Sequence, residues 1–579
     1  MRNLRHVFPY LRRHRLRIII GFLAVAGGTG LSVLQPHLFG LGIDTLRAKH
    51  PSLGHLTFLV GLFLAAAVGQ SLLAFVQRST INRVSRYVEY DLRNDAFRHL
   101  QALDQRFYQE NYTGDLMARL TNDLNQVRQF VGMGMISLIS TGMMLVVVAV
   151  VMVFTDWKLA LVAFAVLPFV SITMVVVGRT MQRRFRLVQD QFGRVSTHAQ
   201  ENFSGIRVVK AFVQEDREIE AFARTNQDFV RYNLSYVRLS GIMWPLMFFV
   251  VGIALALVLY VGGTEVASGE ITLGTWVEFN LYLGLLTWPM ISLGWVINMY
   301  QQGAASMARV MEVMNRNPDI RDSGRTLPIR HIDGAIEFRN VGVRYDDQQV
   351  LHDISFTVPA GKTAAIVGVT GVGKSTLMSL IPRVMEADEG EVLVDGVDVR
   401  RIPLDVLRRN VGYVPQETFL FSASLRSNTM FGIDEAPDSE VLAALEVSRL
   451  SQDLEQFPHG LDTIVGERGV SLSGGQKQRT ALARAVMRDP TILILDDSLS
   501  SIDTHTQAEI LTRLKDVMRD RTTVITSMRI SAIKDADVII VLGDGGVAEH
   551  GTHRELLLND GLYARMYRRE LLQQELEVE

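Results

Sequence analysis

Six apolar windows in the first 300 residues constrain the fold of this chain more than any other feature. A helix needs about 20 residues to cross roughly 30 Å of hydrocarbon, and each window is long enough. The windows cover residues 17–46, 55–78, 130–155, 157–178, 240–262 and 273–297. A short turn at residues 156–158 separates two of them, whereas long charged stretches follow the second and the fourth. We therefore expect an all-α, six-helix transmembrane domain over residues 1–315.

The charge around these windows predicts their orientation. Arginines cluster before the first window, at positions 2, 5, 12, 13, 15 and 17, and such clusters favour the cytoplasmic side. The first window is followed by more apolar sequence and by no cleavage site, which favours an uncleaved anchor. Because an even number of spans returns the chain to the cytoplasm, we expect a multi-pass protein of the cytoplasmic membrane.

Long stretches without proline connect the windows. No proline interrupts residues 55–108 or 169–243, so the helices are expected to continue well beyond the bilayer. The helical pattern breaks near 107–123 and 201–215, which are the expected tips of these helices. Ordinary solvated loops are the alternative interpretation of both tips.

Composition indicates a second, soluble part. The chain has 579 residues, of which 48% are hydrophobic and 21% charged, and its net charge is −2. The length exceeds one core, and the charge disfavours a nucleic-acid binder. With no cysteine, disulfides, cysteine-based zinc sites and thiol catalysis are excluded. Composition shifts in a linker at 316–334, strand-like and helix-like runs then alternate as in an α/β domain over 335–561, and 562–579 is a helix-prone end.

Residues 368–375, with the sequence GVTGVGKS, have the spacing of a phosphate-binding loop. An apolar run at 364–367 precedes the loop and a helix-forming stretch follows it, which is the context such a loop requires. Its backbone N–H groups would hold phosphates, Lys374 would neutralise the β and γ oxygens, and Ser375 would hold Mg²⁺. We expect ATP to contact Thr370, Gly371, Val372, Gly373, Lys374, Ser375 and Thr376.

Further candidates surround this loop in the sequence. Asp496 ends the apolar run 492–496 and could reach the Mg²⁺ shell. Gln416 is placed to ligate Mg²⁺ or orient water, and Tyr345 could stack on adenine. For these three the alternatives are a common strand-ending aspartate, a polar turn residue and a core tyrosine.

The tetrad Ser473-Gly474-Gly475-Gln476 lies between the phosphate loop and Asp496. Its glycines let the backbone approach a phosphate, and Ser473 and Gln476 add hydroxyl and amide donors. A helix follows, with its N-terminus directed at the same anion. This order of motifs is typical of one class of ATPase.

The whole chain resembles half-transporters of the type IV ABC exporter family, in which six spans are fused to one nucleotide-binding domain. The resemblance implies an α/β P-loop ABC ATPase domain with ATP and Mg²⁺ as cofactors. It also implies that 368–375 is the Walker A motif, Asp496 the Walker B aspartate, Gln416 the Q-loop, Tyr345 the adenine-stacking residue and 472–476 the signature. Residues 500–503, with Asp503 near the nucleotide, resemble the D-loop. Residues 465–469 resemble the exporter-specific segment, and the two helix tips resemble coupling helices.

Two positions depart from this family at its chemistry. Asp497 replaces the glutamate that polarises the attacking water, and Met528 replaces a histidine. The shorter side chain withdraws the carboxylate by about 1.5 Å, and a thioether cannot donate to a γ-phosphate. Loss of a general base costs about 10²–10⁴ in rate. ATP binding should survive, whereas hydrolysis at this chain's own site should be slow.

These departures predict the degenerate-site subunit of a heterodimeric bacterial multidrug exporter. Its partner would be a second half-transporter with glutamate and histidine at the matching positions. The substrates would be hydrophobic or amphipathic drugs, lipids or peptides. A slowly hydrolysing homodimer and a non-transporting ATP-gated channel or regulatory protein are the alternatives.

Candidate substrate-binding residues lie within or near the last two apolar windows. Glu278 lies within the sixth window with Tyr282 one turn further, and it is either functional or a structural residue near the outer boundary. Aromatic and amide residues that could line a cavity, or anchor helices at the interface, are Trp244, Trp288, Gln301 and Gln302.

Overall fold

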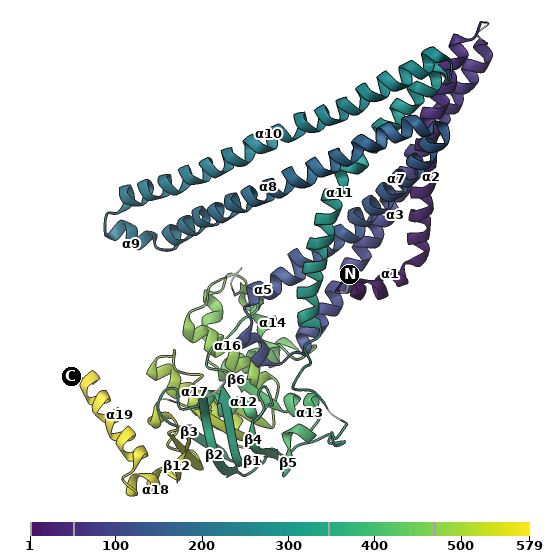
Figure 1. Cartoon of the computed structure of the whole chain (residues 1–579). Helices are drawn as coiled ribbons and strands as arrows, with labels where there is room; N and C mark the ends of the chain where they lie inside the picture. Colours follow the sequence, from purple (N-terminus) through teal and green to yellow (C-terminus); the bar gives the residue numbers. More distant parts are fainter. Residues whose placement is uncertain are drawn as a thin grey trace. The chain divides into compact units, whose positions relative to one another are not determined.

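A computed structural model describes residues 3–49, 52–322, 324–345, 348–466, 470–527 and 529–578 (Figure 1). The chain forms two compact units. Unit 1 comprises Met1–Gln101 and Tyr112–Arg316, and unit 2 comprises Ala102–Asn111 and Asn317–Glu579. The segment Ala102–Asn111 therefore belongs with the C-terminal unit, whereas the sequence predicts one continuous domain over 1–315.

Unit 1 is built of helices. Its long helices are α2 (Arg15–Arg47), α3 (Leu53–Ala102), α7 (Met135–Thr155), α8 (Trp157–Ser204), α10 (Glu215–Ser268) and α11 (Leu273–Met314). Its short helical segments are η1 (Asn3–Val7), α1 (Phe8–Arg13), α5 (Thr113–Ala118), η2 (Arg119–Asp123), α6 (Leu124–Gln129), η3 (Phe130–Gly134) and α9 (Ile206–Ala211).

Five helical stretches of the described chain are long and apolar enough to cross a membrane. They are Arg15–Arg47, Leu53–Ala102, Thr113–Thr155, Glu215–Ser268 and Leu273–Met314. The window expected at 157–178 lies in α8, where the shorter apolar stretch Trp157–Val166 is found. Membrane-spanning helices are thus confirmed, and the count of six stays a prediction.

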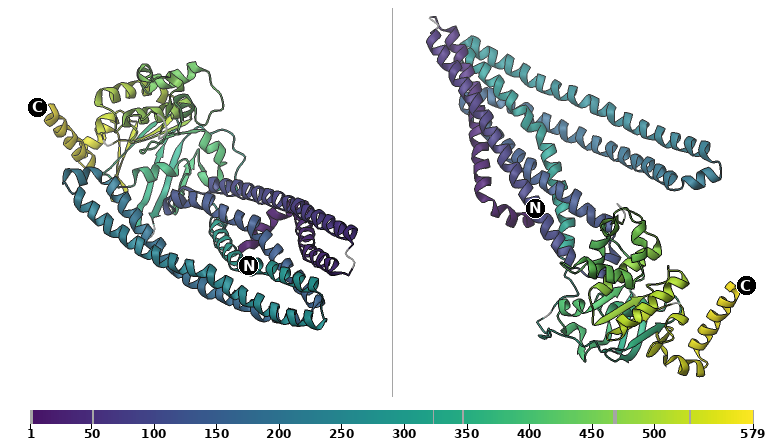
Figure 2. Two further views of the ribbon diagram at one scale, coloured as in Figure 1. Left: turned by 90° about the horizontal axis from the view of Figure 1, so that it is seen from above. Right: turned by 180° about the vertical axis from the view of Figure 1, so that it is seen from behind.

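Helices α8 and α10 form a long antiparallel pair joined by α9 (Figure 2). Asp156, the single residue between α7 and α8, caps α8 by accepting a hydrogen bond from the Leu159 backbone N–H at 2.9 Å. Along the pair, Arg184 donates to the Ser235 carbonyl at 2.8 Å. The prediction that helices extend beyond the apolar windows is confirmed, since α3, α8 and α10 have 50, 48 and 54 residues.

Unit 2 is an α/β domain with two main sheets. Their strand orders are β2-β1-β4-β5 and β12-β11-β3-β10-β9-β6. The strands are β1 (Ile336–Tyr345), β2 (Gln348–Val358), β3 (Thr363–Val367), β4 (Glu389–Val394), β5 (Val397–Asp398), β6 (Val411–Val414), β7 (Ala423–Ser424), β8 (Ile464–Val465), β9 (Ile492–Asp496), β10 (Thr522–Thr526), β11 (Val538–Gly543) and β12 (Gly546–Gly551). β7 and β8 pair separately from the two main sheets.

Helices surround these sheets. They are α4 (Gln105–Glu110), α12 (Lys374–Leu380), η4 (Val399–Arg401), α13 (Leu404–Arg409), α14 (Leu425–Thr429), α15 (Asp438–Val447), η5 (Ser451–Gln456), η6 (Gly460–Asp462), α16 (Gly474–Met487), α17 (Thr504–Met518), η7 (Ile530–Ala532), α18 (His553–Leu558) and α19 (Leu562–Val578).

The parallel strands β3, β10, β9 and β6 position the functional residues. Every residue of β9 is buried, as its continuous apolar pattern predicts for a strand covered on both faces. Thr526 at the end of β10 pairs in register with Asp496 on one side and Ile366 on the other. The carboxyl ends of these strands therefore lie at one edge, where ligands of open α/β sheets bind.

Candidate functional site

The phosphate loop connects β3 to α12, as the sequence predicts. Gly371 and Gly373 have φ of +85° and +98°, a region that glycine adopts without strain. A Cβ on Gly368 would lie 2.9 Å from the Leu542 carbonyl oxygen, and one on Gly373 would lie 2.7 Å from Leu351 Cδ2. These glycines are needed both for the turn and for its close packing.

Lys374 lies at the start of α12 and closes the loop. Its ammonium donates to the carbonyls of Gly368 at 2.9 Å and Val369 at 3.0 Å. Burial lowers the pKa of Lys374, and the nearby carboxylates of Asp497 and Asp496 oppose that shift. The loop thus holds a partly desolvated cation close to two carboxylates, which is an arrangement suited to a phosphate and a divalent cation. Ser375 and Thr376 follow in the same helical turn.

Thr526 fixes the two aspartates that end β9. Its hydroxyl donates to Asp496 Oδ1 at 2.9 Å and accepts from the Asp497 backbone N–H at 2.8 Å. Both Asp496 and Thr526 are 2% exposed. This threonine was missed in the sequence, where its only signal is its place at the end of a buried strand.

Gln416 and Asp497 lie close together, as the sequence predicts for residues at one site. Gln416 follows β6, and its side-chain N–H donates to Asp497 Oδ2 at 3.5 Å, the long end of hydrogen-bond range. The Asp497 backbone has φ of +42°, a region in which aspartate is better tolerated than most residues. Met528, the second degenerate candidate, lies outside the described residues.

The signature tetrad starts α16 through a reciprocal cap. Ser473 Oγ accepts from the Gln476 backbone N–H at 3.2 Å, and Gln476 Oε1 accepts from the Ser473 backbone N–H at 3.0 Å. A Cβ on Gly475 would approach the Ser501 carbonyl oxygen to 3.1 Å. The hydroxyl and the amide oxygen therefore hold the helix start, and glycine allows residues 500–503 to pack against it.

Gln478, which the sequence did not single out, joins the signature helix to residues 500–503. Its amide donates to Ser500 Oγ at 3.1 Å and accepts from the Ser501 backbone N–H at 2.9 Å. The side chain is 4% exposed. Its only sequence signal is its position two residues after Gln476, so its role depends on the fold.

Two other nucleotide candidates have observed partners. Tyr345 ends β1 and donates its hydroxyl to Met385 Sδ at 3.2 Å. It lines a cavity of about 220 Å³ that also includes residues from α4 and from the segment after α12. Asp503 caps α17 by accepting from the Thr506 backbone N–H at 2.9 Å. Their roles toward ATP stay predictions, as does that of residues 467–469, which lie outside the described residues.

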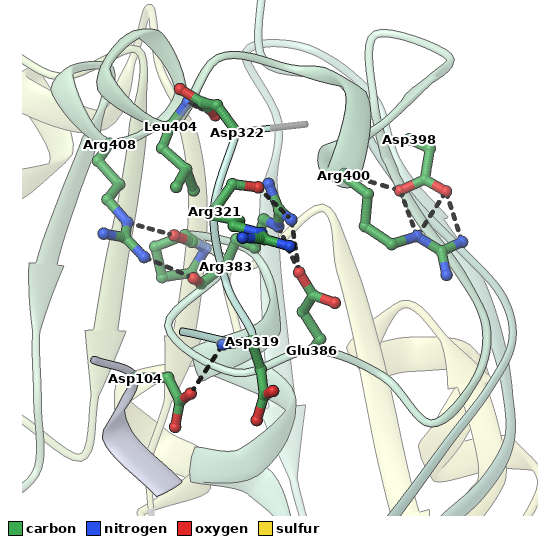
Figure 3. Close-up of polar contacts among 11 residues, drawn as sticks. Asp104, Asp319, Arg321, Asp322, Arg383, Glu386, Asp398, Arg400, Leu404 and Arg408 are labelled. Atoms are coloured by element: carbon green, nitrogen blue, oxygen red, sulfur yellow. Dashed lines mark hydrogen bonds and ion pairs between the residues drawn. The ribbon is translucent and has the colours of Figure 1, made fainter. Parts of the chain in front are cut away.

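Residues 317–322 and 324–330 of the linker belong to unit 2, and we call them the strap. Its Asp319 N–H donates to Asp104 Oδ2 at 3.3 Å, and its Arg321 carbonyl accepts from Arg383 at 3.3 Å (Figure 3). Asp322 Oδ1 accepts from the Leu404 N–H at 3.0 Å. The strap therefore contacts the residue before α4, the segment after α12 and the start of α13.

Arg383 is the buried centre of this cluster. It is 4% exposed, it donates to Glu386 at 2.7 Å, and its carbonyl accepts from Arg408 at 2.7 Å. Figure 3 shows the Arg408 guanidinium directed at backbone carbonyls next to Arg383, and the Arg383 guanidinium directed at Arg321 and Glu386. The strap thus covers charged groups that follow the phosphate-loop helix directly in sequence.

The substrate candidates lie on the helices of unit 1. Glu278 is 5% exposed and lies 3.1 Å from His37 Nδ1, while Tyr282 donates to the Val33 carbonyl at 3.0 Å. Both contacts tie α11 to α2. Trp288 is 68% exposed, Gln301 and Gln302 are exposed on α11, and the Trp244 side chain lies outside the described residues.

Apolar spanning helices in one unit and a phosphate loop beside strand-ending carboxylates in the other define a membrane transporter with an ATPase domain. Residues 18–290 match the family described as ABC transporter transmembrane region, and residues 351–500 match that described as ABC transporter. The chain belongs to the ABC transporter family.

Similar proteins narrow the class. The chain is 36% identical to YheI of Bacillus subtilis, a probable multidrug resistance ABC transporter, over 97% of both chains. It is 32% identical to the multidrug resistance-like protein MdlA of Escherichia coli, over 98% of this chain and 96% of MdlA. An ATP-dependent lipid A-core flippase of Syntrophus aciditrophicus is 35% identical over 85% of this chain and 82% of the flippase.

A solved bacterial Atm1-family ABC exporter with ATP bound has a TM-score of 0.80 and 28% identity, and the match covers 96% of this chain and 98% of that one. The protein is thus a type IV ABC exporter: a multi-pass membrane protein with a cytoplasmic nucleotide-binding domain, whose ATPase drives export.

Proposed function

We propose that this chain is the degenerate-site half of a heterodimeric exporter, which moves hydrophobic or amphipathic substrates across the cytoplasmic membrane. The observation that carries the proposal is Asp497 at the position where the family has glutamate. A carboxylate shorter by one methylene lies about 1.5 Å further from an attacking water, whereas a useful hydrogen bond tolerates only a few tenths of an ångström.

The surroundings of Asp497 support this interpretation because they fix its backbone on both sides. Its N–H donates to Thr526 Oγ1 at 2.8 Å, and its carbonyl accepts from Ser500 Oγ at 2.9 Å. The main chain therefore has little freedom to advance and compensate for the missing methylene. Met528 adds a second deficit, because sulfur is a weak acceptor and donates no hydrogen bond.

ATP binding is expected to survive these changes. Lys374 would neutralise the β and γ oxygens, and Ser375, Asp496 and Gln416 offer the oxygen ligands that Mg²⁺ prefers. Asp496 Oδ1 is held by Thr526, which orients the other carboxylate oxygen. Mg²⁺ would supply charge neutralisation at the β and γ phosphates.

In the proposed assembly each ATP site combines one chain's Walker motifs with the other chain's signature. The signature on α16 would then complete the partner's competent site, provided that the partner has glutamate and histidine at the positions of Asp497 and Met528. ATP-driven closure would be transmitted through the predicted coupling segments near 107–123 and 201–215 to the membrane helices, which alternate between two states of access.

Drugs, lipids and hydrophobic peptides are the proposed substrates. Similarity to a probable multidrug resistance transporter and to a lipid A-core flippase supports an amphipathic substrate. The first alternative, a slowly hydrolysing homodimer, requires that the isolated chain transport substrate without a second kind of subunit. A non-transporting channel or regulator would bind ATP and move no substrate against a gradient.

ATP turnover by the purified full chain tests the proposal. Alone it should bind nucleotide but hydrolyse it about 10²–10⁴ times more slowly than with its partner. In the complex, Ser473→Ala should lower steady-state ATPase more than Asp497→Asn, since only the first change affects the competent site. Comparable activity of the isolated chain, or equal losses in the two variants, would refute the degenerate-site assignment.

A double-mutant cycle on single-turnover hydrolysis is the sharper test. Asp497→Glu alone should restore little, because Met528 still lacks a donor and position 497 has a positive φ that suits aspartate. Adding Met528→His should increase the rate by more than the product of the two single effects, because both groups act on one transition state. Independent effects would contradict that account.

A further inference from the structure

Unit 1 contains a cavity of about 910 Å³ between α3, the α6–η3 segment and α11. Its lining combines three arginines, three large apolar side chains and four amides. The arginines are Arg83, Arg86 and Arg128, and the apolar residues are Met133, Trp295 and Met299. The volume is within the range of pockets that hold drug-sized ligands.

Positive charge dominates this cavity. No acidic side chain lines it in the described part of the chain. The nearby carboxylate is Glu89, which is 8% exposed. It is shared by Arg86 at 3.3 Å, Arg128 at 3.2 Å and Arg93 at 2.6 Å. One carboxylate among three guanidinium groups leaves positive charge in excess, and Arg83 adds more.

The cavity is also amphipathic along the expected membrane normal. Trp295 lies within the apolar window that ends at 297, whereas Arg83 and Arg86 lie five and eight residues beyond the window that ends at 78. At 1.5 Å per residue, the arginine backbones are roughly 8–12 Å beyond the hydrocarbon boundary. Trp295 is 49% exposed and Met133 is 55% exposed, so apolar surface is available next to the charges.

We propose that this cavity binds amphipathic anions, in which an apolar body carries a phosphate, sulfonate or carboxylate group. The guanidinium groups provide planar donors for the anionic head, and Trp295 with the two methionines contacts the apolar body. The inference rests on the proposed export function for its role in substrate selection, although binding can be measured without transport. Arginines that only determine membrane topology do not require apolar side chains beside them, whereas the arginines of this cavity adjoin Trp295 and two methionines.

Matched probes test the charge preference. Three dansyl-labelled dodecyl amphiphiles differ only in a phosphate, trimethylammonium or maltoside headgroup. They are titrated by fluorescence into the full chain, in its assembled complex, in phosphatidylcholine nanodiscs. The phosphate probe should bind at least about tenfold more tightly than the trimethylammonium probe, as expected for a charge-assisted contact. Inorganic phosphate at equal concentration should not displace it, because it lacks the apolar body.

Arg83 is the cleanest position to change, because the other two cavity arginines also hold the buried Glu89. Arg83→Gln should reduce phosphate-probe affinity by about three- to tenfold, and Arg83→Lys should retain most of it. Trp295→Ala should weaken all three probes alike. Arg231→Gln is the matched control, since Arg231 is an exposed arginine on α10 outside the cavity.

The outcomes separate this inference from the export proposal. Equal affinity for the phosphate and trimethylammonium probes, an unchanged ratio in Arg83→Gln, or displacement by inorganic phosphate would overturn the anion site. ATP-dependent uptake into proteoliposomes is measured with the same probes. A preserved affinity ratio without uptake of any probe would refute export and leave the anion site standing. Uptake of the trimethylammonium probe, together with equal affinities for the phosphate and trimethylammonium probes, would support export and refute the anion site.

Discussion

Replacing Asp104 with alanine should loosen the segment Ala102–Asn111 within unit 2. Asp104 uses both carboxylate oxygens: Oδ1 caps α4 by accepting from the Phe107 N–H at 3.1 Å, and Oδ2 accepts from the Asp319 N–H at 3.3 Å. Loss of an N-cap costs about 1 kcal/mol, and a long, exposed hydrogen bond adds about 0.5 kcal/mol. The local opening equilibrium should therefore shift by about 1–2 kcal/mol, or roughly 5–30-fold.

Amide hydrogen exchange of the full chain measures this shift. Because α4 has only six residues, too few to be stable alone, its protection depends on these contacts and on the buried Phe107. Asp104→Asn should give an exchange rate between those of the unchanged chain and Asp104→Ala. Its side chain has one carbonyl oxygen, which can keep only one of the two contacts at full strength. Gln105→Ala, at an exposed position of the same helix, is the control. Equal exchange in the alanine variants at 104 and 105 would refute the reasoning.

Three further predictions concern unit 2 and unit 1. Gln478→Ala removes the two hydrogen bonds that the buried Gln478 amide makes with Ser500 and Ser501, so it should lower stability by about 1–3 kcal/mol in chemical unfolding, whereas Gln478→Glu should restore only the accepting contact. The backbone N–H of Thr506 holds the pKa of Asp503 below its ordinary value of 3.8. The ionised Asp503 carboxylate therefore stabilises the folded state above that pH, and this stabilisation is lost as pH falls through the lowered pKa. Asp503→Asn should remove this part of the pH dependence of thermal unfolding below pH 4. Arg309→Ala removes the 2.9 Å hydrogen bond to the buried Asp123. It should lower the stability of unit 1 by about 1–3 kcal/mol, a range reduced because the arginine is half exposed to solvent. The control Arg231→Ala should leave the stability almost unchanged.

Local patterns were enough to predict much of unit 2. The continuous apolar run at 492–496 is a fully buried strand, because a strand covered on both faces needs apolar side chains throughout. The glycines of the phosphate loop adopt the backbone that their spacing indicates. The length of α3 was equally predictable from local sequence, since no proline interrupts it. α10 continues through Pro245, beyond the proline-free stretch that ends at residue 243.

Contacts between distant residues could not be predicted in this way. Asp104 and Asp319 are 215 residues apart, and nothing near either one shows that they meet. Thr526 and Gln478 were missed for the same reason: an ordinary strand threonine and helix glutamine gain their roles only when β9 and residues 500–503 pack against them. Motif residues with a fixed spacing can therefore be found in the sequence, whereas the residues that position them become visible only in the fold.

These positioning contacts form a continuous structural connection within unit 2. Asp104 holds the strap, and Asp322 of the strap accepts from the first N–H of α13. Asn410 follows α13 and leads directly into β6, after which Gln416 donates to Asp497.

Energetic coupling along this connection is tested by perturbing its two ends separately. If the strap transmits changes at α4 to the ATP site, Asp104→Ala should alter exchange around Gln416 as well as around α4, and Gln105→Ala should alter neither. A change in exchange confined to α4 would show that the strap binds the segment Ala102–Asn111 but does not transmit changes in its stability to the ATP site.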